Sequence, residues 1–197
     1  FLYTISSLKI WNKRIRFSVN YGSAMISELV HIGCVLWSEK NILLWTCGWL
    51  GKDLQSWDII IPPYTYGNES AIRMYNRTEN YKQYSNIGLS GALKNRLLSQ
   101  GIECFGGPLI TCNGMLGETQ EDIHWWSADG YYWVEMESAT MFAVSNRFWV
   151  PASAMVFVSD NLIQNQLVGD ETHKNQIGLR KEKHNLLMEI AIKELLS

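Results

Sequence analysis

The sequence has 197 residues, of which 47% are hydrophobic and 18% are charged, and its formal net charge is −2. This composition excludes an intrinsically disordered chain, and the charge gives no reason to expect a nucleic-acid partner. Polar residues interrupt every apolar run well before the ~20 residues that span a bilayer, so no membrane partner is expected. We therefore expect a single soluble domain over residues 1–197, with its four separated cysteines reduced, in the cytoplasm.

The first part of the chain predicts a strand, a helix and a second strand. Apolar and polar residues alternate over 15–19, which indicates a half-buried strand. Apolar residues then recur at helical spacing over 23–37, with Ser23 as the helix N-cap. Residues 41–46 form a continuous apolar run that ends at a predicted turn over 47–48, as expected of a strand buried on both faces. This succession predicts a parallel crossover unit.

The rest of the chain continues the alternation of strands and helices. Residues 63–84 are rich in Tyr, Asn and Gly without clear periodicity, and we expect them to form a long loop. The pattern predicts an α/β fold of three layers, α/β/α, around a central mixed, largely parallel sheet. The predicted strands are 58–62, 104–111 and 152–158, and the predicted helices are 89–101, 116–126, 136–144 and 187–195.

Several common functional motifs are absent from the sequence. There is no glycine-rich dinucleotide or P-loop motif, no H-E-x-x-H and no G-x-S-x-G. The four histidines lie far apart, and none has ligand-like spacing to another His or to a Cys. We therefore expect no metal site.

Asp160 follows directly on the predicted strand 152–158, and open α/β sheets bind ligands at the carboxyl ends of their strands. Desolvation at such a place raises the pKa of a carboxyl group, which would let Asp160 act as a general acid near neutral pH. The alternative is that Asp160 caps the turn formed by Ser159, Asp160 and Asn161. The residues alone do not decide between these two interpretations.

Glu135 and Glu137 flank Met136 at the predicted start of the helix 136–144. Exposed N–H groups and the helix dipole favour negative charge there, and this accounts for one of the two carboxylates. A second carboxylate beside aromatic residues suggests a binding role, because its two oxygens can accept from two adjacent hydroxyls of a diol.

These residues carry a resemblance to a known family. "VEMESATMFAV" (134–144) followed by "VSDN" (158–161) resembles the paired V-E-M-E-x-A and S-D signatures of the nucleoside phosphorylase superfamily. "LWTCGWL" (44–50) followed by "DIIIP" (58–62) resembles the family's G-[ST]-x-G turn and its G-D-[IV]-[IV]-I-P strand. Gly22 falls at the family's glycine turn, and "TCNGMLGE" (111–118) is similar to a segment of one branch.

The resemblance implies roles for particular residues. Asp160 would donate a proton or a hydrogen bond to the leaving purine, and Glu137 would bind the ribose hydroxyls. The ribose site would also include Met136 and Glu135. The resemblance further implies a base pocket of Thr111, Cys112, Asn113, Met115 and Ser159, and a phosphate site that includes Gly22 and Thr46.

The phosphate site departs from the family pattern. Leu43 stands where bacterial purine enzymes have an arginine, and Trp45 stands at the first glycine of the G-[ST]-x-G turn. The early phosphate loop has no match, which leaves a strand before Phe1 or no such strand as alternatives. In the base pocket, Met115 and Leu116 occupy positions of stacking aromatic residues, and His173 and Lys174 are the nearest candidates for a base-contacting arginine.

The sequence thus predicts an enzyme that cleaves a purine-type nucleoside with inorganic phosphate as co-substrate and without a cofactor. Two alternatives are a nucleosidase that uses water, and a degenerate protein of the same fold that binds or stores a ligand without turnover. The resemblance implies a homo-oligomer, a trimer or a hexamer, and the nine tryptophans and the tyrosine-rich 63–84 segment suit a large interface.

Overall fold

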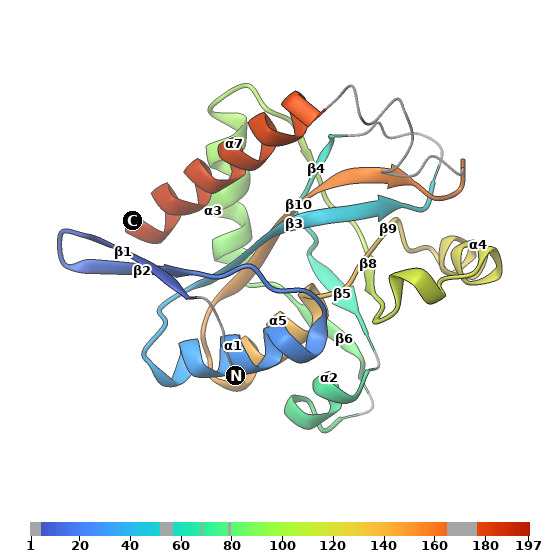
Figure 1. Ribbon diagram of the computed structural model, residues 1–197, viewed down its shortest axis with the longest axis horizontal. Helices are drawn as coiled ribbons and strands as arrows, with labels where there is room; N and C mark the ends of the chain where they lie inside the picture. Colours follow the sequence, from blue (N-terminus) through green and yellow to red (C-terminus); the bar gives the residue numbers. More distant parts are fainter. Residues whose placement is uncertain (1–4, 52–56, 68, 79, 165–176) are drawn as a thin grey trace.

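The computed structural model describes residues 5–51, 57–67, 69–78, 80–164 and 177–197. These residues form an eight-stranded mixed sheet with helices on both faces, and a two-stranded hairpin that projects from it (Figure 1). The strand order of the large sheet is β6-β5-β8-β9-β3-β10-β4-β7. The predicted α/β fold with a mixed central sheet is therefore confirmed.

Two long strands form the centre of this sheet. β3 (Asn41–Trp49) and β10 (Ala152–Asn161) run parallel along their whole length, and their apolar residues fill the core because helices cover both faces. The pairing of β10 with β3 shifts by one residue between Val158 and Asp160, where a β-bulge interrupts the ladder. The outer strands are β4 (Ile59–Ile60), β5 (Tyr64–Tyr66), β6 (Lys82–Tyr84), β7 (Cys104–Phe105), β8 (Leu109–Thr111) and β9 (Trp133–Glu135).

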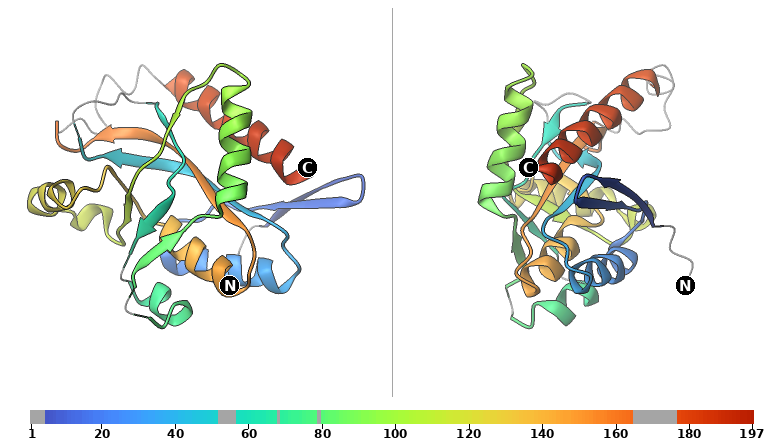
Figure 2. Two further views of the ribbon diagram at one scale, coloured as in Figure 1. Left: turned by 180° about the vertical axis from the view of Figure 1, so that it is seen from behind. Right: turned by 90° about the vertical axis from the view of Figure 1, so that its left-hand side faces the viewer.

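The helices divide between the two faces of the sheet (Figure 2). α3 (Ile87–Leu98) and α7 (Ile177–Leu196) cover one face, where Leu93 and Leu187 pack with Met155 of β10. α1 (Ser23–Val35) and α5 (Ser138–Arg147) cover the other face and pack with Ala154 of the same strand. Burial on both sides explains why β10 is a continuous apolar run in the sequence.

The beginning of the chain differs from the prediction. Residues 15–19 belong in part to β2 (Lys13–Phe17), which pairs with β1 (Ser6–Ile10) in an antiparallel hairpin. Because β2 is in a different sheet from β3, the expected parallel crossover unit does not form. Val19 is 85% exposed, so the alternation that predicted a half-buried strand does not reflect burial along its whole length.

One predicted loop and one predicted turn contain regular structure. The segment 63–84 includes β5, the short helix α2 (Ser70–Tyr75) and β6, which form one edge of the large sheet. The predicted turn at 47–48 is wrong, because β3 continues through Gly48 to Trp49 and pairs there with β9. Strand pairing between distant segments overrides the local sequence signal at both places.

The helix ends differ from the predictions in their caps. Gly22, not Ser23, is the N-cap of α1, and no side chain caps this helix. The predicted helix 116–126 is α4 (Gln120–Ala128), which begins with a capping box of Thr119 and Asp122. It is preceded by a 3₁₀ turn, η1 (Met115–Gly117). None of the described helices is both long and apolar enough to cross a membrane.

Candidate active site

The sheet register brings the predicted acidic residues to the two sides of one strand. Asp160 of β10 pairs with Gly48 of β3, and Gly48 pairs on its other side with Val134 of β9. Glu135 follows Val134, so Glu135 and Asp160 flank the end of β3 at Cys47 and Gly48. Burial raises the pKa of the Cys47 thiol, and the nearby charges of Glu135 and Asp160 raise it further, as this arrangement requires.

Glu135 is a buried carboxylate whose two oxygens each accept two hydrogen bonds from within the protein. Its Oε1 accepts hydrogen bonds from Thr111 Oγ1 at 2.5 Å and from Ser138 Oγ at 2.7 Å. Its Oε2 accepts from the backbone N–H groups of Glu137 and Ser138, both at 2.8 Å. Glu135 therefore satisfies the first N–H groups of α5 and ties β9 to β8. Burial raises its pKa, and these hydrogen bonds oppose that rise.

Glu137 differs from Glu135 although it lies only two residues further along the chain. It is 1% exposed and is the N-cap of α5, but its side chain does not cap this helix. Its Oε1 accepts a 2.6 Å hydrogen bond from the backbone N–H of Gly22, whereas its buried Oε2 has no hydrogen-bond partner among the described residues. Burial, followed by the charge of Glu135, raises the pKa of Glu137 to about 7.

The start of α1 connects Glu137 to a third carboxylate. Ser23 Oγ lies 2.9 Å from the backbone oxygen of Met136 and 2.7 Å from Glu69 Oε1. Glu69 Oε1 also accepts from Thr140 Oγ1 at 2.7 Å, and Glu69 Oε2 is buried without a partner among the described residues. The sequence pattern predicts Ser23 only as a helix cap and places Glu69 in a loop, so it does not indicate this cluster.

Asp160 is half-buried at the end of β10, next to the fully buried Ser159. Ser159 Oγ donates to Asp160 Oδ2 at 2.8 Å, and it lies 3.3 Å from the backbone oxygen of Cys47. Burial raises the pKa of Glu118, and the charges of Asp122 and Asp160 raise it further. Glu118 therefore lies within electrostatic reach of Asp160.

Glu118 links Asp160 to the predicted base pocket. Cys112 Sγ lies 2.8 Å from Glu118 Oε1, and burial together with this contact raises the pKa of the Cys112 thiol to about 12. Cys112 follows Thr111, whose hydroxyl binds Glu135. Glu118 ends the quoted motif 111–118, and the 3₁₀ turn η1 lies between it and Cys112 in the chain.

The remaining predicted residues are less closely connected. Asn113 and Met115 are exposed, and Tyr21 Oη lies 3.8 Å from Met115 Sδ. Thr46 is half-buried in β3, and within the described part of the chain its hydroxyl makes no hydrogen bond. Leu116 is 95% exposed. His173 and Lys174 lie outside the described residues.

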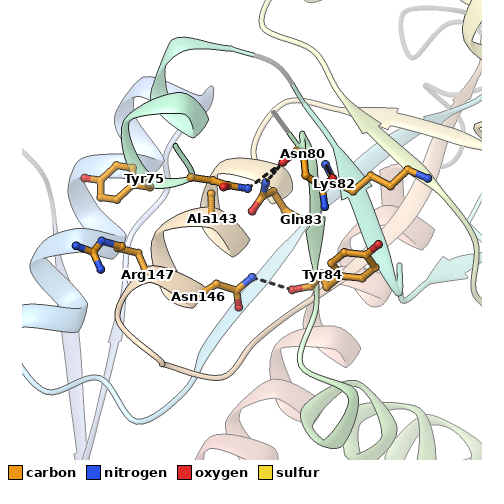
Figure 3. Close-up of a pocket in the computed structure, with 9 residues that line it drawn as sticks. Tyr75, Asn80, Lys82, Gln83, Tyr84, Ala143, Asn146 and Arg147 are labelled. Carbon is orange, nitrogen blue, oxygen red and sulfur yellow. Dashed lines mark hydrogen bonds between the residues drawn. The ribbon is translucent and has the colours of Figure 1, made fainter. Parts of the chain in front are cut away.

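A separate pocket of about 330 Å³ lies at the opposite end of α5 (Figure 3). Its lining includes Tyr75, Gln83 and Asn146, and Asn146 Nδ2 donates to the backbone oxygen of Tyr84 at 3.2 Å. None of the predicted site residues lines this pocket. The carboxylates at the start of α5 are chemically better suited to a reaction, because three of them are held within one connected network.

A family model described as "Phosphorylase superfamily" matches residues 42–192, which is most of the chain. The chain belongs to the phosphorylase superfamily. Its sequence identity to individual superfamily members is low, at 22–25%.

Three curated proteins illustrate this relationship. The chain is 24% identical over 154 residues to the DeoD-type purine nucleoside phosphorylase of Clostridium novyi, covering 78% of this chain and 63% of that protein. The corresponding enzyme of a Geobacillus species is 25% identical, with 86% and 68% covered. The guanosine phosphorylase of Halorubrum lacusprofundi is 24% identical, with 75% and 59% covered. The chain thus spans less than two thirds of the first of these superfamily members.

Solved structures share the fold of the chain. An MTAN mutant of Helicobacter pylori with 5′-methylthioadenosine in its active site gives a TM-score of 0.81 at 14% identity, covering 98% of this chain and 85% of that one. A futalosine hydrolase mutant of the same organism gives 0.82 at 14% identity, with 98% and 86% covered. The AMP nucleosidase of Bacteroides thetaiotaomicron gives 0.74 at 18% identity, with 98% and 78% covered. At these identities the likeness establishes the superfamily fold.

Proposed function

We propose that this protein cleaves the N-glycosidic bond of a purine-type nucleoside, with Glu137 as the ribose anchor and Asp160 as the general acid. The observation that carries the proposal is the asymmetry of Glu137. One oxygen is fixed by the Gly22 N–H, and the other is buried without a partner among the described residues. A buried oxygen without a donor is costly, and a ribose hydroxyl would supply that donor. The backbone at Met136 borders the same position.

The proposed acid would act on the base. Cleavage of an N-glycosidic bond passes through an oxocarbenium-like state, in which negative charge develops on the leaving purine. Asp160 would donate a proton or hydrogen bond to that purine, and Ser159 Oγ would orient its carboxyl group. Glu118 is an acidic neighbour of Asp160, because the charge of Asp160 contributes to the raised pKa of Glu118. Thr111, Cys112, Asn113 and Met115 would border the base.

The attacking group is phosphate in our first proposal, in keeping with the curated relatives that are named phosphorylases. Phosphate would approach the start of α1, where Gly22 is the N-cap and no side chain caps the helix. Thr46 would add a hydroxyl.

Hydrolysis is the second candidate, and one observation favours it. The described contacts around the start of α1 and α5 come from carboxylates, namely Glu69, Glu135 and Glu137, and no Lys or Arg is bonded to them there. Water tolerates such surroundings better than a phosphate dianion does. The proposal otherwise stays the same: a homo-oligomer in the cytoplasm, acting on a small nucleoside without a cofactor.

The test is a panel of purine nucleosides incubated with the protein, with and without phosphate, while free base is measured. Release that requires phosphate supports phosphorolysis, and release without phosphate supports hydrolysis. Asp160→Asn should lower kcat by about 10²–10⁴ with a smaller change in KM. Asp129→Asn, at the exposed end of α4, is the matched control and should leave kcat unchanged. Absence of release by the folded protein would contradict the proposal and favour a degenerate binding protein.

A further inference from the structure

Four non-glycine residues in the described part of the chain have a positive φ, and all four are tryptophan. The φ angles are 52° at Trp11, 63° at Trp37, 81° at Trp57 and 60° at Trp149. This left-handed region is unfavourable for a bulky side chain, and Asn and Asp are the usual exceptions to glycine there. The four residues therefore share a residue type, although they lie in different regions of the fold.

Two of these tryptophans end helices in the same way. At the end of α1, the N–H of Trp37 donates to Cys34 O and the N–H of Ser38 donates to Gly33 O. At the end of α5, the N–H of Trp149 donates to Asn146 O and the N–H of Val150 donates to Ser145 O. Each pair of bonds defines a Schellman motif, with tryptophan at the left-handed C′ position where glycine is usual.

Two other helices of this chain end in the same motif and have glycine at the left-handed position. At the end of α3, Gly101 (φ 71°) donates to Leu98 O, and Ile102 donates to Leu97 O. At the end of α4, Gly130 (φ 84°) makes the equivalent bond to Ser127 O. Four helices therefore end in one backbone motif, with glycine in two of them and tryptophan in the other two.

Trp11 occupies a third kind of glycine position. It is the first of two loop residues between β1 and β2, because Ile10 pairs with Lys13. A positive φ at the first loop residue but not at Asn12 is the pattern of a type II′ turn, which has glycine at that first position.

The sequence also places Trp57 and Trp45 at positions where the family patterns have glycine. Trp57 precedes Asp58 at the glycine of the G-D-[IV]-[IV]-I-P pattern, and Trp45 stands at the first glycine of G-[ST]-x-G. Trp49 and Trp133 pack together with a ring-centroid distance of 5.6 Å, and both bury their indole N–H without an acceptor among the described residues. A buried donor without an acceptor destabilises the folded protein.

At three of the four positions, the side chain does not explain the backbone conformation. Trp11, Trp37 and Trp149 are 82%, 90% and 91% exposed, so no packing energy offsets the strain. Trp11 is at the tip of the hairpin, whereas the other two lie beside the starts of β3 and β10. Aromatic residues recruited for one interface would share a surface, but they would not share a left-handed φ.

We propose that positions 11, 37, 57 and 149 are glycine in the protein that the cell makes. The codon UGA is read as stop, as tryptophan or as glycine in different genetic codes, so one codon can connect these two residue types. Reading UGA as glycine explains why tryptophan alone, and not Asn or Asp, occupies the strained positions. The proposal also covers positions 45, 49 and 133, which would be glycine for the same reason.

This inference also bears on the proposed function without depending on it. Glycine at position 45 would supply the first glycine of the G-[ST]-x-G pattern next to Thr46, and glycines at 49 and 133 would remove two bulky rings where β3 pairs with β9. The rings of Trp49 and Trp133 pack with Cys47 and Val158, so glycine at both positions would leave more space around the end of β3.

The direct test is the codon at each position in the gene, together with peptide mass spectrometry of the protein purified from its own cells. We expect UGA at 11, 37, 57 and 149, and peptides whose masses correspond to glycine. Peptides that carry tryptophan at 37 and 149 would overturn the proposal. Neither measurement depends on activity, so this proposal and the proposed function can fail separately.

A stability series tests the physical premise. Trp11→Gly, Trp37→Gly and Trp149→Gly in the recombinant full chain should each raise Tm by about 2–4 °C, because each relieves strain at an exposed site. Trp126→Gly is the control, since Trp126 packs inside α4 against a core cluster, and it should lower Tm. A fall in Tm at all three exposed positions would contradict the backbone argument.

Discussion

Glu135 and Glu137 are two buried carboxylates on the same short segment, and they differ in what surrounds them. Glu135 accepts four hydrogen bonds from β8 and from the start of α5. Glu137 has one oxygen held by Gly22 and one without a partner among the described residues. A saturated buried carboxylate of this kind organises the fold, and we propose that the unsaturated one accepts a hydrogen bond from a ligand.

The largest expected effect separates the two residues by stability. Glu135→Ala should lower the free energy of unfolding by about 3–5 kcal/mol, because it leaves the Thr111 and Ser138 hydroxyls and two N–H groups without an acceptor. Urea denaturation measures this loss. Glu121→Ala, on the exposed first turn of α4, is the control and should change stability little. A loss below 1 kcal/mol would remove the structural role of Glu135.

The next effect is the pH dependence of stability. The pKa of Glu137 is about 7 in the folded protein, above its ordinary value of 4.5. A raised carboxyl pKa contributes stability that is fully present below about pH 4.5 and is lost as pH rises through about 7. The loss is on the order of 3 kcal/mol. Unfolding measured at pH 5 and pH 8 should show a smaller difference in Glu137→Gln than in the unsubstituted protein, and an equal difference would contradict this assignment.

Ligand binding tests the proposed role of Glu137 as an acceptor for the ribose hydroxyls. Glu137→Gln should weaken nucleoside binding by about 1.5–3 kcal/mol, because the ribose hydroxyl loses a charged acceptor. Calorimetric titration with a nucleoside and with its 2′,3′-dideoxy analogue measures this loss. The dideoxy analogue should bind the variant and the unsubstituted protein equally. If both ligands lose the same affinity, Glu137 does not act through the ribose hydroxyls.

The smallest effect concerns a single donor to Glu135. Ser138→Ala removes the 2.7 Å hydrogen bond to Oε1 but leaves the backbone N–H bond to Oε2. We expect a loss of about 1 kcal/mol in the free energy of unfolding. Ser99→Ala, at the exposed end of α3, provides a control that should be nearly neutral. A loss as large as that of Glu135→Ala would mean that the network depends on this hydroxyl alone.

Much of the architecture followed from local sequence patterns. The patterns predict β10, α3 and α4 near their observed positions, because burial on one or both faces leaves a clear periodicity. The predicted helix 187–195 covers only the second half of α7. The hairpin β1–β2 and the edge strands β5 and β6 were missed. Their existence depends on pairing between segments, which a short window of sequence does not record.

The candidate site was predicted unevenly for a similar reason. Glu137 and Asp160 stood out as carboxylates at the ends of apolar segments. The different role of Glu135 could not be predicted, because its donors come from Thr111 on another strand and from the helix that follows. Glu69 and Glu118 reach the site only through α2 and the 3₁₀ turn, so no spacing in the sequence indicated them.

The bulge near the end of β10 lets one strand contribute residues both to the hydrophobic core and to the candidate site. Side chains alternate along a regular strand, so a residue two places after Val158 would share its buried face. The extra residue changes this parity: Asp160 takes the place opposite Gly48 that the next residue would have had, and Ser159 stays within 2.8 Å of its carboxylate. A single inserted residue thus keeps the acid out of the hydrophobic layer while the preceding seven residues remain free to pack as core.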